Sequence, residues 1–549
     1  MGTRLVAALA SVSTTVLLVA GTSVVAVPAS SAAPGQAAAP ASLPLGPEGL
    51  PEVRTKITLQ RGVTLTTIVR GEVDPRHFWT LQLNVPALTS PDPDAPPTAL
   101  SDRTSAETLA DRLRRAGFEP RVEEVTAPAT ADYLGGRLGF RVRVGRLLDQ
   151  PAATALLAVL VRQGFTAAIR FTGWDGSTTD RGPWRLQVLT LDPRTFDGHL
   201  LASFGPDIEH RETTSSLSRA VGATAAVNAG YFVLDPKAGA PGDPAGLGVY
   251  GGRVRSESVG RRPALVLSSD ARRTRVQRLR WRGSVLAGDS RLSLDGINRV
   301  PGLIRNCGGT RDDQPTAAPV HDFTCTDASE LVAFTPQFGM ATPAGPGLEA
   351  VMDRHQRVVS LRSPRGGPLM AHHRSVQATG SRVAALRRVA SLGSRLRISA
   401  SLSDQRGRPV RTPRTTSIVN GGPELVRAGR VHVTPQADGF VRPRDPSFYD
   451  GFSASRNPRT FAGVDRSGRT VLVTADGRST ASLGLSITET AAAAKALGLQ
   501  AALNLDGGGS TTMVARGRVT NQPSDVTGER PVGDALLVLP RRGTEALPR

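Results

Sequence analysis

One short segment gathers residue types that could do chemistry: Asn504-Leu505-Asp506-Gly507-Gly508-Gly509-Ser510-Thr511. It follows a predicted apolar strand over 501–505 and supplies one carboxylate, three glycines and several hydroxyl groups. Glycine lets the backbone turn sharply and approach a ligand closely, and three in succession exceed what a turn requires. The segment therefore predicts a functional site, with Asp506 as its charged group and Gly507, Gly508, Ser510 and Thr511 around a ligand.

Three further predicted strands end in polar, glycine-bearing turns: Asn228-Ala229-Gly230, Asn420-Gly421-Gly422 and Asp476-Gly477. The segment 455–460 adds Arg456 and Arg459. If these strand ends meet on one rim, asparagine, arginine and aspartate converge on a pocket. The planar guanidinium fork suits a phosphate, and the asparagine amide suits sugar hydroxyls. Asparagine and glycine are also the best turn residues, and for Asp476 a simple turn between strands is the favoured interpretation.

Two charged residues near the C-terminus have competing interpretations. Glu489 is a candidate for proton transfer, but it stands three residues after Ser486 at the start of a predicted helix over 488–497. That spacing is a capping box, which is the favoured interpretation. Arg530 precedes Pro531 and either contacts a substrate or braces the last strand.

The surrounding pattern predicts an α+β protein with a small domain made of two βαβ halves and a larger β-rich domain. Helices are expected over 105–116 and 151–162, each followed by a Gly-Phe pair and a strand. This segment, 76–172, resembles a SPOR (sporulation-related repeat) domain, on Phe140-Arg141-Val142-Arg143-Val144-Gly145, Ala152, Ala155, Leu160 and Gly164-Phe165. The resemblance implies binding to peptidoglycan glycan strands.

Segment 180–540 resembles the phosphodiester glycosidase family. The matching residues are Val227-Asn228-Ala229-Gly230-Tyr231-Phe232, Asn420-Gly421-Gly422-Pro423, Arg456-Asn457-Pro458-Arg459-Thr460, Ser486-Ile487-Thr488-Glu489, Leu503 to Ser510, and Glu529-Arg530-Pro531-Val532. Two features depart from the family pattern: Asp534 stands where asparagine is expected, and a cysteine-bearing insert over 286–362 is a possible lid.

The resemblance implies hydrolysis of a sugar-1-phosphodiester of the N-acetylglucosamine-1-phosphodiester kind. It places Asp506 near the anomeric carbon as base or nucleophile, with Arg456 and Arg459 on the phosphate side and Glu489 as a further catalytic candidate. Asn228, Ser510 and Thr511 would position sugar hydroxyls and phosphate oxygens, with Gly230, Asn420, Gly421, Asp476 and Arg530 also in the binding site. Whether the enzyme retains or inverts configuration depends on a carboxylate separation that sequence does not give.

Length and charge narrow the class of protein. A chain of 549 residues is too long for a single core. The net charge is +20 and comes almost wholly from arginine, which favours anionic partners such as phosphate-bearing envelope polymers. Only 4% of residues are aromatic, and no basic cluster is interleaved with aromatics, so nucleic acid is the weaker candidate partner.

The N-terminus predicts export, and the strong bias for arginine over lysine is typical of a bacterium with a GC-rich genome. Residues 1–33 resemble a secretory signal peptide, with an apolar run after Arg4 and small residues at 31–33. An Ala/Pro-rich linker is expected over 34–55, and no membrane anchor is expected after signal cleavage. In an exported chain Cys307 and Cys325 are expected to form a disulfide.

Two alternatives remain open. The larger domain could hold a cell-wall glycan without cleaving it. A metal-dependent phosphodiesterase that cuts the far P–O bond would require a dense cluster of Asp and His, which the sequence lacks, so neither a metal nor another cofactor is expected, although a single cation at Asp506 stays open.

Overall fold

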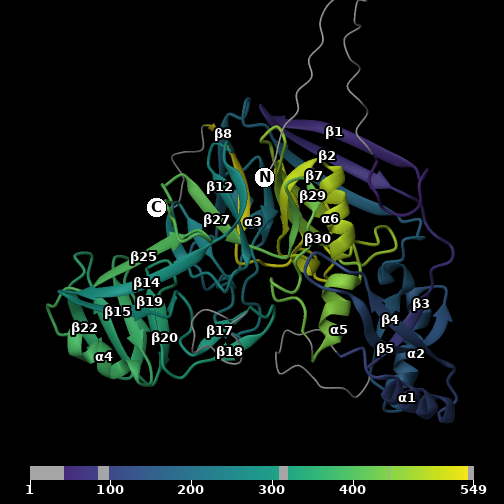
Figure 1. The fold of residues 1–549 in the computed structure, drawn as a ribbon, viewed down its shortest axis with the longest axis horizontal. Helices are drawn as coiled ribbons and strands as arrows, with labels where there is room; N and C mark the ends of the chain where they lie inside the picture. The colour runs from purple at the N-terminus through teal and green to yellow at the C-terminus, as the bar shows by residue number, and fades with distance from the viewer. Residues whose placement is uncertain (1–41, 85–97, 308–318, 443, 542–549) are drawn as a thin grey trace, which may run out of the picture. The chain divides into compact units, whose positions relative to one another are not determined.

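The computed structural model describes residues 42–84, 98–307, 319–442 and 444–541. Its main element is an antiparallel eight-stranded sheet in the order β1-β2-β7-β31-β30-β32-β28-β29 (Figure 1). The strands are β1 (Glu52–Gln60), β2 (Val63–Arg70), β7 (Trp184–Leu191), β31 (Thr470–Ala475), β30 (Arg459–Asp465), β32 (Leu499–Asn504), β28 (Glu424–Arg427) and β29 (Arg430–Val431). Strands with a few short helices confirm the predicted α+β class.

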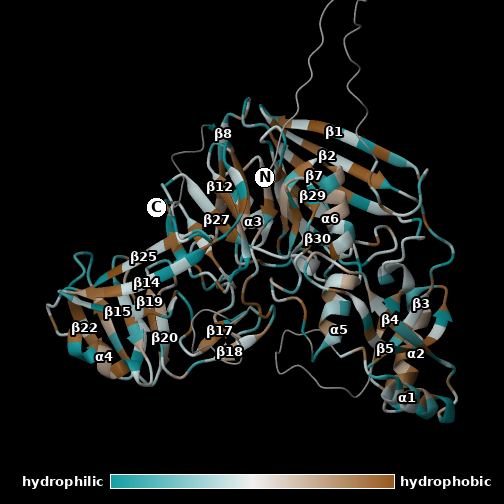
Figure 2. Ribbon diagram, viewed as in Figure 1, coloured by the Kyte–Doolittle hydropathy of each residue, from teal (hydrophilic) through white to brown (hydrophobic). Residues whose placement is uncertain are grey.

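Each face of this sheet packs on a different core, because side chains alternate along a strand. On β31, Val471 and Val473 face the core that contains helix α6 (Ile487–Ala496), whereas Leu472 faces the opposite core. Apolar residues accordingly alternate with polar ones along the strands in Figure 2.

Two five-stranded sheets complete the opposite core. One has the order β34-β33-β9-β35-β8 and the other β11-β10-β27-β12-β13. Their strands are β34 (Arg518–Val519), β33 (Met513–Ala515), β9 (Ala225–Asn228), β35 (Ala535–Pro540), β8 (Gly198–Ser203), β11 (Arg253–Ser256), β10 (Gly248–Tyr250), β27 (Thr416–Asn420), β12 (Pro263–Ser268) and β13 (Thr274–Arg278).

The predicted pair of βαβ halves is present as a four-stranded sheet in the order β4-β5-β3-β6. Helices α1 and α2 both lie against this sheet (Figure 1). The elements are β3 (Trp79–Leu83), α1 (Arg103–Arg115), β4 (Pro120–Ala127), β5 (Gly136–Leu147), α2 (Gln150–Arg162) and β6 (Ala167–Phe171).

This unit interrupts the larger domain rather than preceding it. Strands β2 and β7 flank the unit in sequence and pair directly, with Arg70 opposite Trp184. The larger domain therefore begins at β1 and not at residue 180, because its sheet needs the two strands that precede the inserted unit.

The expected linker over 34–55 is wrong from residue 42 onward. Leu43 and Leu45 are buried in the core beside α6 and the inserted unit. The buried Arg70 guanidinium donates to the carbonyls of Leu45, Leu50 and Pro47, at 2.8, 3.4 and 3.2 Å. These bonds fasten the segment to the end of β2 because a buried guanidinium must satisfy its donors. The predicted signal peptide lies outside the described residues. Within the described ranges, no helix is long and apolar enough to cross a bilayer.

The cysteine-bearing insert is longer than the predicted 286–362. It forms a sheet in the order β15-β14-β25-β26 and a second sheet in the order β16-β19-β24-β21-β22, and it has its own core. The elements are β14 (Arg280–Ala287), β15 (Ser290–Leu294), β16 (Gly296–Ile297), β19 (Leu331–Phe334), β21 (Leu348–Met352), β22 (Val358–Arg362), β24 (Arg374–Ala378), α4 (Arg382–Val389), β25 (Arg397–Ser403) and β26 (Pro409–Val410).

Two short hairpins branch from the insert: β20 (Ala341–Gly345) with β23 (Arg365–Pro368), and β17 (Leu303–Arg305) with β18 (Thr324–Thr326). The second hairpin carries the disulfide between Cys307 and Cys325, whose Cα atoms are 5.5 Å apart. The predicted pairing of the two cysteines is confirmed.

The buried N-terminal segment makes a stability prediction. Leu45→Ala should lower the free energy of unfolding by about 2–4 kcal/mol, because it removes a fully buried leucine. Leu134→Ala is the matched control, since Leu134 is 94% exposed, and its effect should stay within about 0.5 kcal/mol. Urea denaturation of both variants checks this, and equal effects would contradict a packed segment.

Candidate active site

Three strand ends meet at Asp506, as the sequence predicted. The Asp506 backbone N–H donates to the carbonyl of Ala229 at 2.9 Å, and its carbonyl accepts from Asn228 Nδ2 at 2.7 Å. These contacts join the end of β32 to the end of β9. The end of β27 joins them through Asn420, whose amide exchanges two 3.0 Å hydrogen bonds with the backbone of Tyr231.

The asparagines hold the site together from below. Asn228 is fully buried, and its Oδ1 accepts from Thr460 Oγ1 at 2.7 Å and from the Thr512 N–H at 3.1 Å. The Asn420 amide is likewise buried and occupied on both sides. Both amides therefore fix the backbone around Asp506 instead of presenting groups to a sugar.

Glycine is required where the loop approaches its neighbours. A Cβ at Gly509 would collide with Asp525 Oδ1 and Arg530 Nη2, and one at Gly507 would lie 2.9 Å from the carbonyl of Pro458. Gly508 has a φ of +59°, and its added Cβ would lie 3.3 Å from Arg478 Nη2. The glycines let two arginines approach the backbone beside Asp506.

Two of the other predicted glycines serve packing. A Cβ at Gly230 would lie 2.8 Å from Asn420 Nδ2, and one at Gly421 would lie 2.6 Å from Leu503 Cδ1. The Gly230 N–H donates to Asp534 Oδ1 at 2.7 Å, while Asp534 Oδ2 accepts from the Tyr250 hydroxyl at 2.7 Å. The unexpected aspartate thus anchors the turn after β9, and burial raises its pKa to about 6.

The electrostatics of Asp506 suit proton transfer near neutral pH. Burial raises its pKa to about 7, against the opposing effects of a hydrogen bond with Ser510 and the positive charge of Arg530. The negative charge of Asp322 contributes to the rise. A carboxyl group with such a pKa can both take and return a proton at physiological pH.

Two arginines, Arg478 and Arg530, lie next to the glycine loop of this site. Arg530 pairs with Asp525 through contacts of 2.7 and 3.0 Å, and a quarter or so of each side chain is exposed. Arg478 donates to Asn457 Oδ1 at 3.0 and 3.2 Å. Burial, and then the charges of Arg170 and Arg530, lower the pKa of Arg478. Guanidinium groups that repel one another are a ready site for an anion.

Aromatic side chains pack around Tyr231, in the turn that follows β9. Tyr231 donates its hydroxyl hydrogen to the Gly422 carbonyl at 2.6 Å and accepts from Asn504 Nδ2 at 2.8 Å. The ring of His321 lies 4.3 Å from the ring of Tyr231, and the Arg262 guanidinium lies 5.2 Å from it.

The expected role of Arg456 on the phosphate side is wrong. Its side chain is fully buried and pairs with Asp180 and, at 2.6 Å, with Glu489. Its remaining donors bond the carbonyls of Gly173 and Ser177, both at 2.9 Å. With these bonds made, Arg456 fastens the segment after β6 to the larger domain and has no donor left for a substrate.

Glu489 belongs to the same ion cluster. Its Oε2 accepts from the Ser486 N–H at 2.9 Å, and its own N–H donates to Ser486 Oγ at 3.1 Å. The capping box is confirmed, and the second carboxylate oxygen pairs with Arg456. A catalytic role for Glu489 is therefore wrong, because both oxygens are engaged at the helix start.

Arg459 and Asp476 also support the site from behind. Arg459 is buried and donates to the carbonyls of Leu485, at 2.9 Å, and Phe452. Asp476 is buried rather than placed in a hairpin turn, and its Oδ1 accepts from the Gln522 N–H at 3.0 Å. Burial raises its pKa to about 6. Ser510 and Thr511 are buried beside Asp506, and their role in positioning sugar hydroxyls and phosphate oxygens remains a prediction.

Sequence reasoning missed Arg478, Asp322, His321 and Arg262. Arg478 directly follows the Asp476-Gly477 turn, which was interpreted as a plain connection, and the other three belong to no glycine-bearing strand end, which was the signal used. A usable signal for two of them was their place between the only two cysteines, since a disulfide near a site fixes what lies inside its loop.

Among the described residues, one trio has the spacing of metal ligands: Asp74, His77 and Asp180. Arg76 contacts Asp74 at 2.6 Å, and Arg456 contacts Asp180. The two guanidinium groups neutralise the two carboxylates, so the trio is better described as an ion-pair cluster.

Comparison with known proteins agrees with this architecture. Residues 348–539 match the model of the phosphodiester glycosidase family, and residues 98–171 match that of the SPOR domain. The crystal structure of a Burkholderia pseudomallei K96243 protein inferred to be exported has a TM-score of 0.81 and 33% identity, over 91% of this chain and 98% of that one. A hypothetical protein from Synechocystis, with a TM-score of 0.51 and 18% identity over 89% and 76% of the two chains, shares the fold.

Two curated mammalian relatives are N-acetylglucosamine-1-phosphodiester alpha-N-acetylglucosaminidases. The mouse (Mus musculus) protein is 33% identical over 109 residues, and the human (Homo sapiens) protein is 27% identical over 205 residues. The alignments cover 20% and 34% of this chain but only 21% and 39% of the two relatives. The chain thus contains a phosphodiester glycosidase domain, matched over residues 348–539, and a SPOR domain that is inserted between two paired strands of the main sheet.

The corrected role of Arg456 can be tested against that of Arg530. Arg456→Gln should lower the free energy of unfolding by about 3–5 kcal/mol, because it leaves two buried carboxylates uncompensated. Arg530→Gln breaks only a half-buried pair, and its cost should stay below about 1 kcal/mol. Chemical denaturation of both variants measures the difference. A well-folded, stable Arg456→Gln protein would return Arg456 to the list of substrate contacts.

Proposed function

We propose that this chain is an exported hydrolase that cleaves a sugar-1-phosphodiester, of the N-acetylglucosamine-1-phosphodiester kind, in a cell-envelope or exported glycan. The family assignment and the names of the two mammalian relatives support the reaction class. The SPOR domain supports retention on peptidoglycan glycan strands, and this retention would raise the local concentration of the enzyme at its substrate.

The observation that carries this proposal is the position of Asp506 beside two arginines. A carboxyl group whose pKa burial raises to about 7 stands at the end of β32, with Arg530 near enough to oppose that rise. Arg478 lies over Gly508 on the same loop. Hydrolysis of a sugar phosphodiester needs this combination, because one end of the reacting bond is an anion and the other end must accept water.

In the proposed reaction, a water oxygen bonds to the anomeric carbon as the bond from that carbon to the phosphate oxygen breaks. The electron pair leaves with the phosphate, and the products are the free sugar and a phosphomonoester. Asp506 takes the proton of the attacking water and later returns it to solvent. Arg530 and Arg478 hold the phosphate and offset the charge that develops on it.

Two features support export: a disulfide and an exported relative. The chain has a disulfide, which is typical of proteins outside the cytoplasm. Its relative from Burkholderia is itself inferred to be exported.

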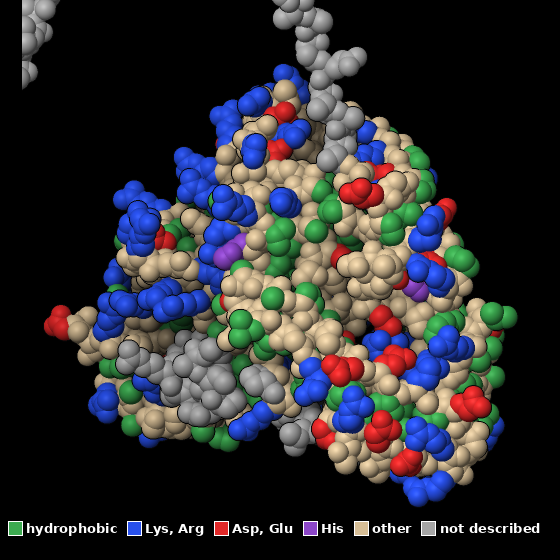
Figure 3. Space-filling model, turned by 45° about the vertical axis from the view of Figure 1, so that its right-hand side comes forward, with side chains coloured by type: hydrophobic (Ala, Val, Ile, Leu, Met, Phe, Trp, Pro, Cys, Tyr) green, Lys and Arg blue, Asp and Glu red, His purple; other side chains and the backbone are tan. Residues whose placement is uncertain are grey.

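Basic side chains are spread over the face shown in Figure 3 rather than gathered in one patch. A broadly basic surface suits an anionic envelope polymer better than one defined nucleic-acid site.

Turnover of a model substrate tests the proposal. The parent chain should release free sugar and a phosphomonoester from an α-linked N-acetylglucosamine-1-phosphodiester, followed by mass spectrometry. Asp506→Asn should lower kcat by about 100-fold or more, because it cannot accept the proton. Asp289→Asn is the matched control, since Asp289 lies exposed in the turn after β14 and should leave kcat unchanged.

The same proteins separate the enzyme from a glycan-binding protein. No turnover by the parent on any sugar-1-phosphodiester, together with retention on peptide-free sacculi, would replace the proposed activity by binding alone.

The pKa of Asp506 predicts a pH dependence of both activity and stability. Because Asp506 must be deprotonated to act as base, kcat/KM should rise with pH to a plateau, with a midpoint near pH 7. The raised pKa means that the folded state binds more protons than the unfolded state between about pH 4 and 7, so stability falls as pH rises through this window. At pH 8, Asp506→Asn should therefore melt about 2–4 °C above the parent. The raised pKa corresponds to a few kcal/mol, and about 1 kcal/mol shifts the Tm of a chain of this length by about 1 °C.

Thermal unfolding and initial rates between pH 5 and 9 check both predictions. A flat kcat/KM profile across pH 7 would contradict the role of Asp506 as base.

A further inference from the structure

We propose that Asp322 is the second carboxylate of the active site, held opposite Asp506 by the disulfide-closed hairpin β17–β18. This rests on the proposed function and assigns it a further catalytic residue. Glycosidases commonly place two carboxyl groups around the reacting bond. The other described carboxyl groups around the glycine loop are engaged in the fold: Asp525 with Arg530, Asp534 with Tyr250, Glu489 with Arg456 and Asp476 with the Gln522 N–H. The loop itself thus supplies one carboxyl group, Asp506.

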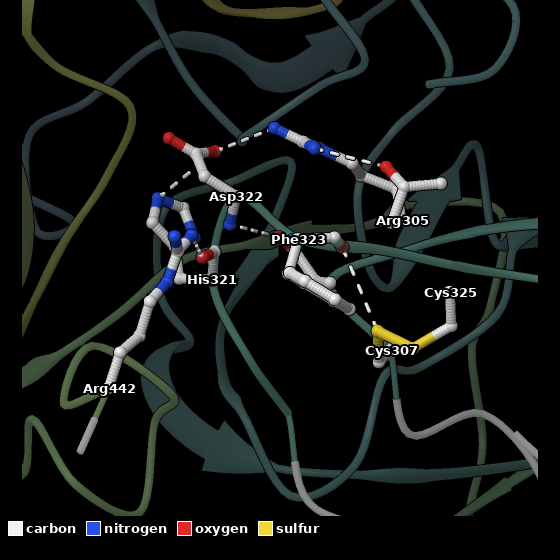
Figure 4. Close-up of a disulfide and its surroundings, with 9 residues drawn as sticks. Arg305, Cys307, His321, Asp322, Phe323, Cys325 and Arg442 are labelled. Carbon is white, nitrogen blue, oxygen red and sulfur yellow. Dashed lines mark hydrogen bonds and ion pairs between the residues drawn. A yellow bond between two sulfur atoms is a disulfide. The ribbon is translucent and has the colours of Figure 1, made fainter. Parts of the chain in front are cut away.

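The hairpin fixes the backbone of Asp322 (Figure 4). Ile304 pairs with Cys325 across the two strands, and Cys325 is bonded to Cys307. The Asp322 N–H donates to Asn306 Oδ1 at 2.9 Å, while Asn306 Nδ2 donates to the Ala245 carbonyl at 2.7 Å. Asp322 has a φ of +54°, a conformation that non-glycine residues rarely adopt and that is common at functional sites.

Its neighbour His321 anchors the hairpin to the site. The His321 ring is buried 4.3 Å from Tyr231 and 4.3 Å from Phe440, and its Nδ1 lies 2.9 Å from Arg262 Nη2. Tyr231 follows, by two residues, the carbonyl that accepts from the Asp506 N–H. Contacts through the His321 ring thus link the Asp322 carboxylate to Tyr231, and the charge of Asp322 contributes to the raised pKa of Asp506.

The charged groups around Asp322 differ from those around Asp506. Arg305 Nη2 lies 3.0 Å from Asp322 Oδ1, and His321 Nε2 lies 3.6 Å from the same oxygen. Burial and the charges of Arg262, Arg305 and Arg442 lower the pKa of His321 well below its usual range, so the imidazole is neutral. Figure 4 shows Arg305, Asp322 and His321 linked in this order.

These surroundings divide the work between the two carboxyl groups. Asp322 forms an ion pair with Arg305, whereas burial favours the protonated form of Asp506. Carboxyl groups held in contrasting environments take different roles in acid–base catalysis. In the proposed division, the Asp322 carboxylate stabilises the positive charge that grows on the anomeric carbon, while Asp506 transfers the proton of water. Asp322 itself forms no covalent bond in this scheme.

The test combines activity with a readout that needs no turnover. Asp322→Asn should lower kcat/KM on the same sugar-1-phosphodiester by about 100-fold or more, while the control Asp289→Asn leaves it unchanged. Separately, the difference in Tm between the parent and Asp506→Asn, followed from pH 5 to 9, reports the titration of Asp506. Repeated with Asp322→Asn in both proteins, its midpoint should move to lower pH, because the charge of Asp322 contributes to the raised pKa of Asp506. Asp322→Glu keeps the charge and should keep the midpoint near that of the parent.

Each outcome decides the proposal. An unmoved midpoint in the Asp322→Asn background would overturn the placement of Asp322 opposite Asp506. A moved midpoint with unchanged kcat/KM would overturn its catalytic role. If the parent hydrolyses no sugar-1-phosphodiester, the proposed function fails and the catalytic role fails with it, while the Tm titration still decides whether the two carboxyl groups face each other. If Asp322→Asn does not fold, Asp322→Glu carries the test. Its titration midpoint and kcat/KM must both follow those of the parent, and a lower midpoint or a kcat/KM as low as that of Asp506→Asn would overturn the proposal.

Discussion

A single buried amide ties the active-site loop to the core. Asn228 bonds the Asp506 carbonyl, the Thr460 hydroxyl and the Thr512 N–H, so it joins β9, the start of β30 and the glycine loop. Each of these partners would cost about 1–3 kcal/mol if it were buried without a bond. The position of Asp506 is therefore set by the packing of two sheets rather than by the loop itself, and the glycines let Arg478 and Arg530 lie close to the loop backbone.

The same constraint reaches the SPOR domain through a second buried group. Arg456 directly precedes Asn457, which accepts a hydrogen bond from Arg478. Arg456 pairs with Asp180, in the segment that follows β6, and with Glu489 of helix α6. Because the SPOR domain is inserted between the paired strands β2 and β7, both of its ends are fixed to the catalytic sheet. A glycan strand bound by that domain would meet the site at a defined geometry, unlike one captured by a module on a flexible tether.

The sequence predicted what depends on local chemistry. The α+β class, the two βαβ halves, the disulfide and the capping box all follow from periodicity or short spacing. The convergence at Asp506 could also be predicted, because an apolar strand that ends in Asn or Asp followed by glycine is a pattern that the sequence shows directly. Arg456 shows the limit: a motif arginine was read as a phosphate ligand, but its partners Asp180 and Glu489 lie 276 and 33 residues away. Which arginine is buried among acids and which faces a ligand is a tertiary property.

The insert shows why its own residues escaped notice. Asp322 has meaning only beside Asp506, and the two are brought together by a hairpin whose strands have three residues each. So short a hairpin cannot hold a strained, positive-φ aspartate against a buried histidine by its own hydrogen bonds. The disulfide supplies that constraint, and Arg262 and Tyr231 supply the surface on which His321 rests. A covalent link is thus most useful at the one part of the site that the sheets do not reach, since elsewhere the core itself keeps the reacting groups in place.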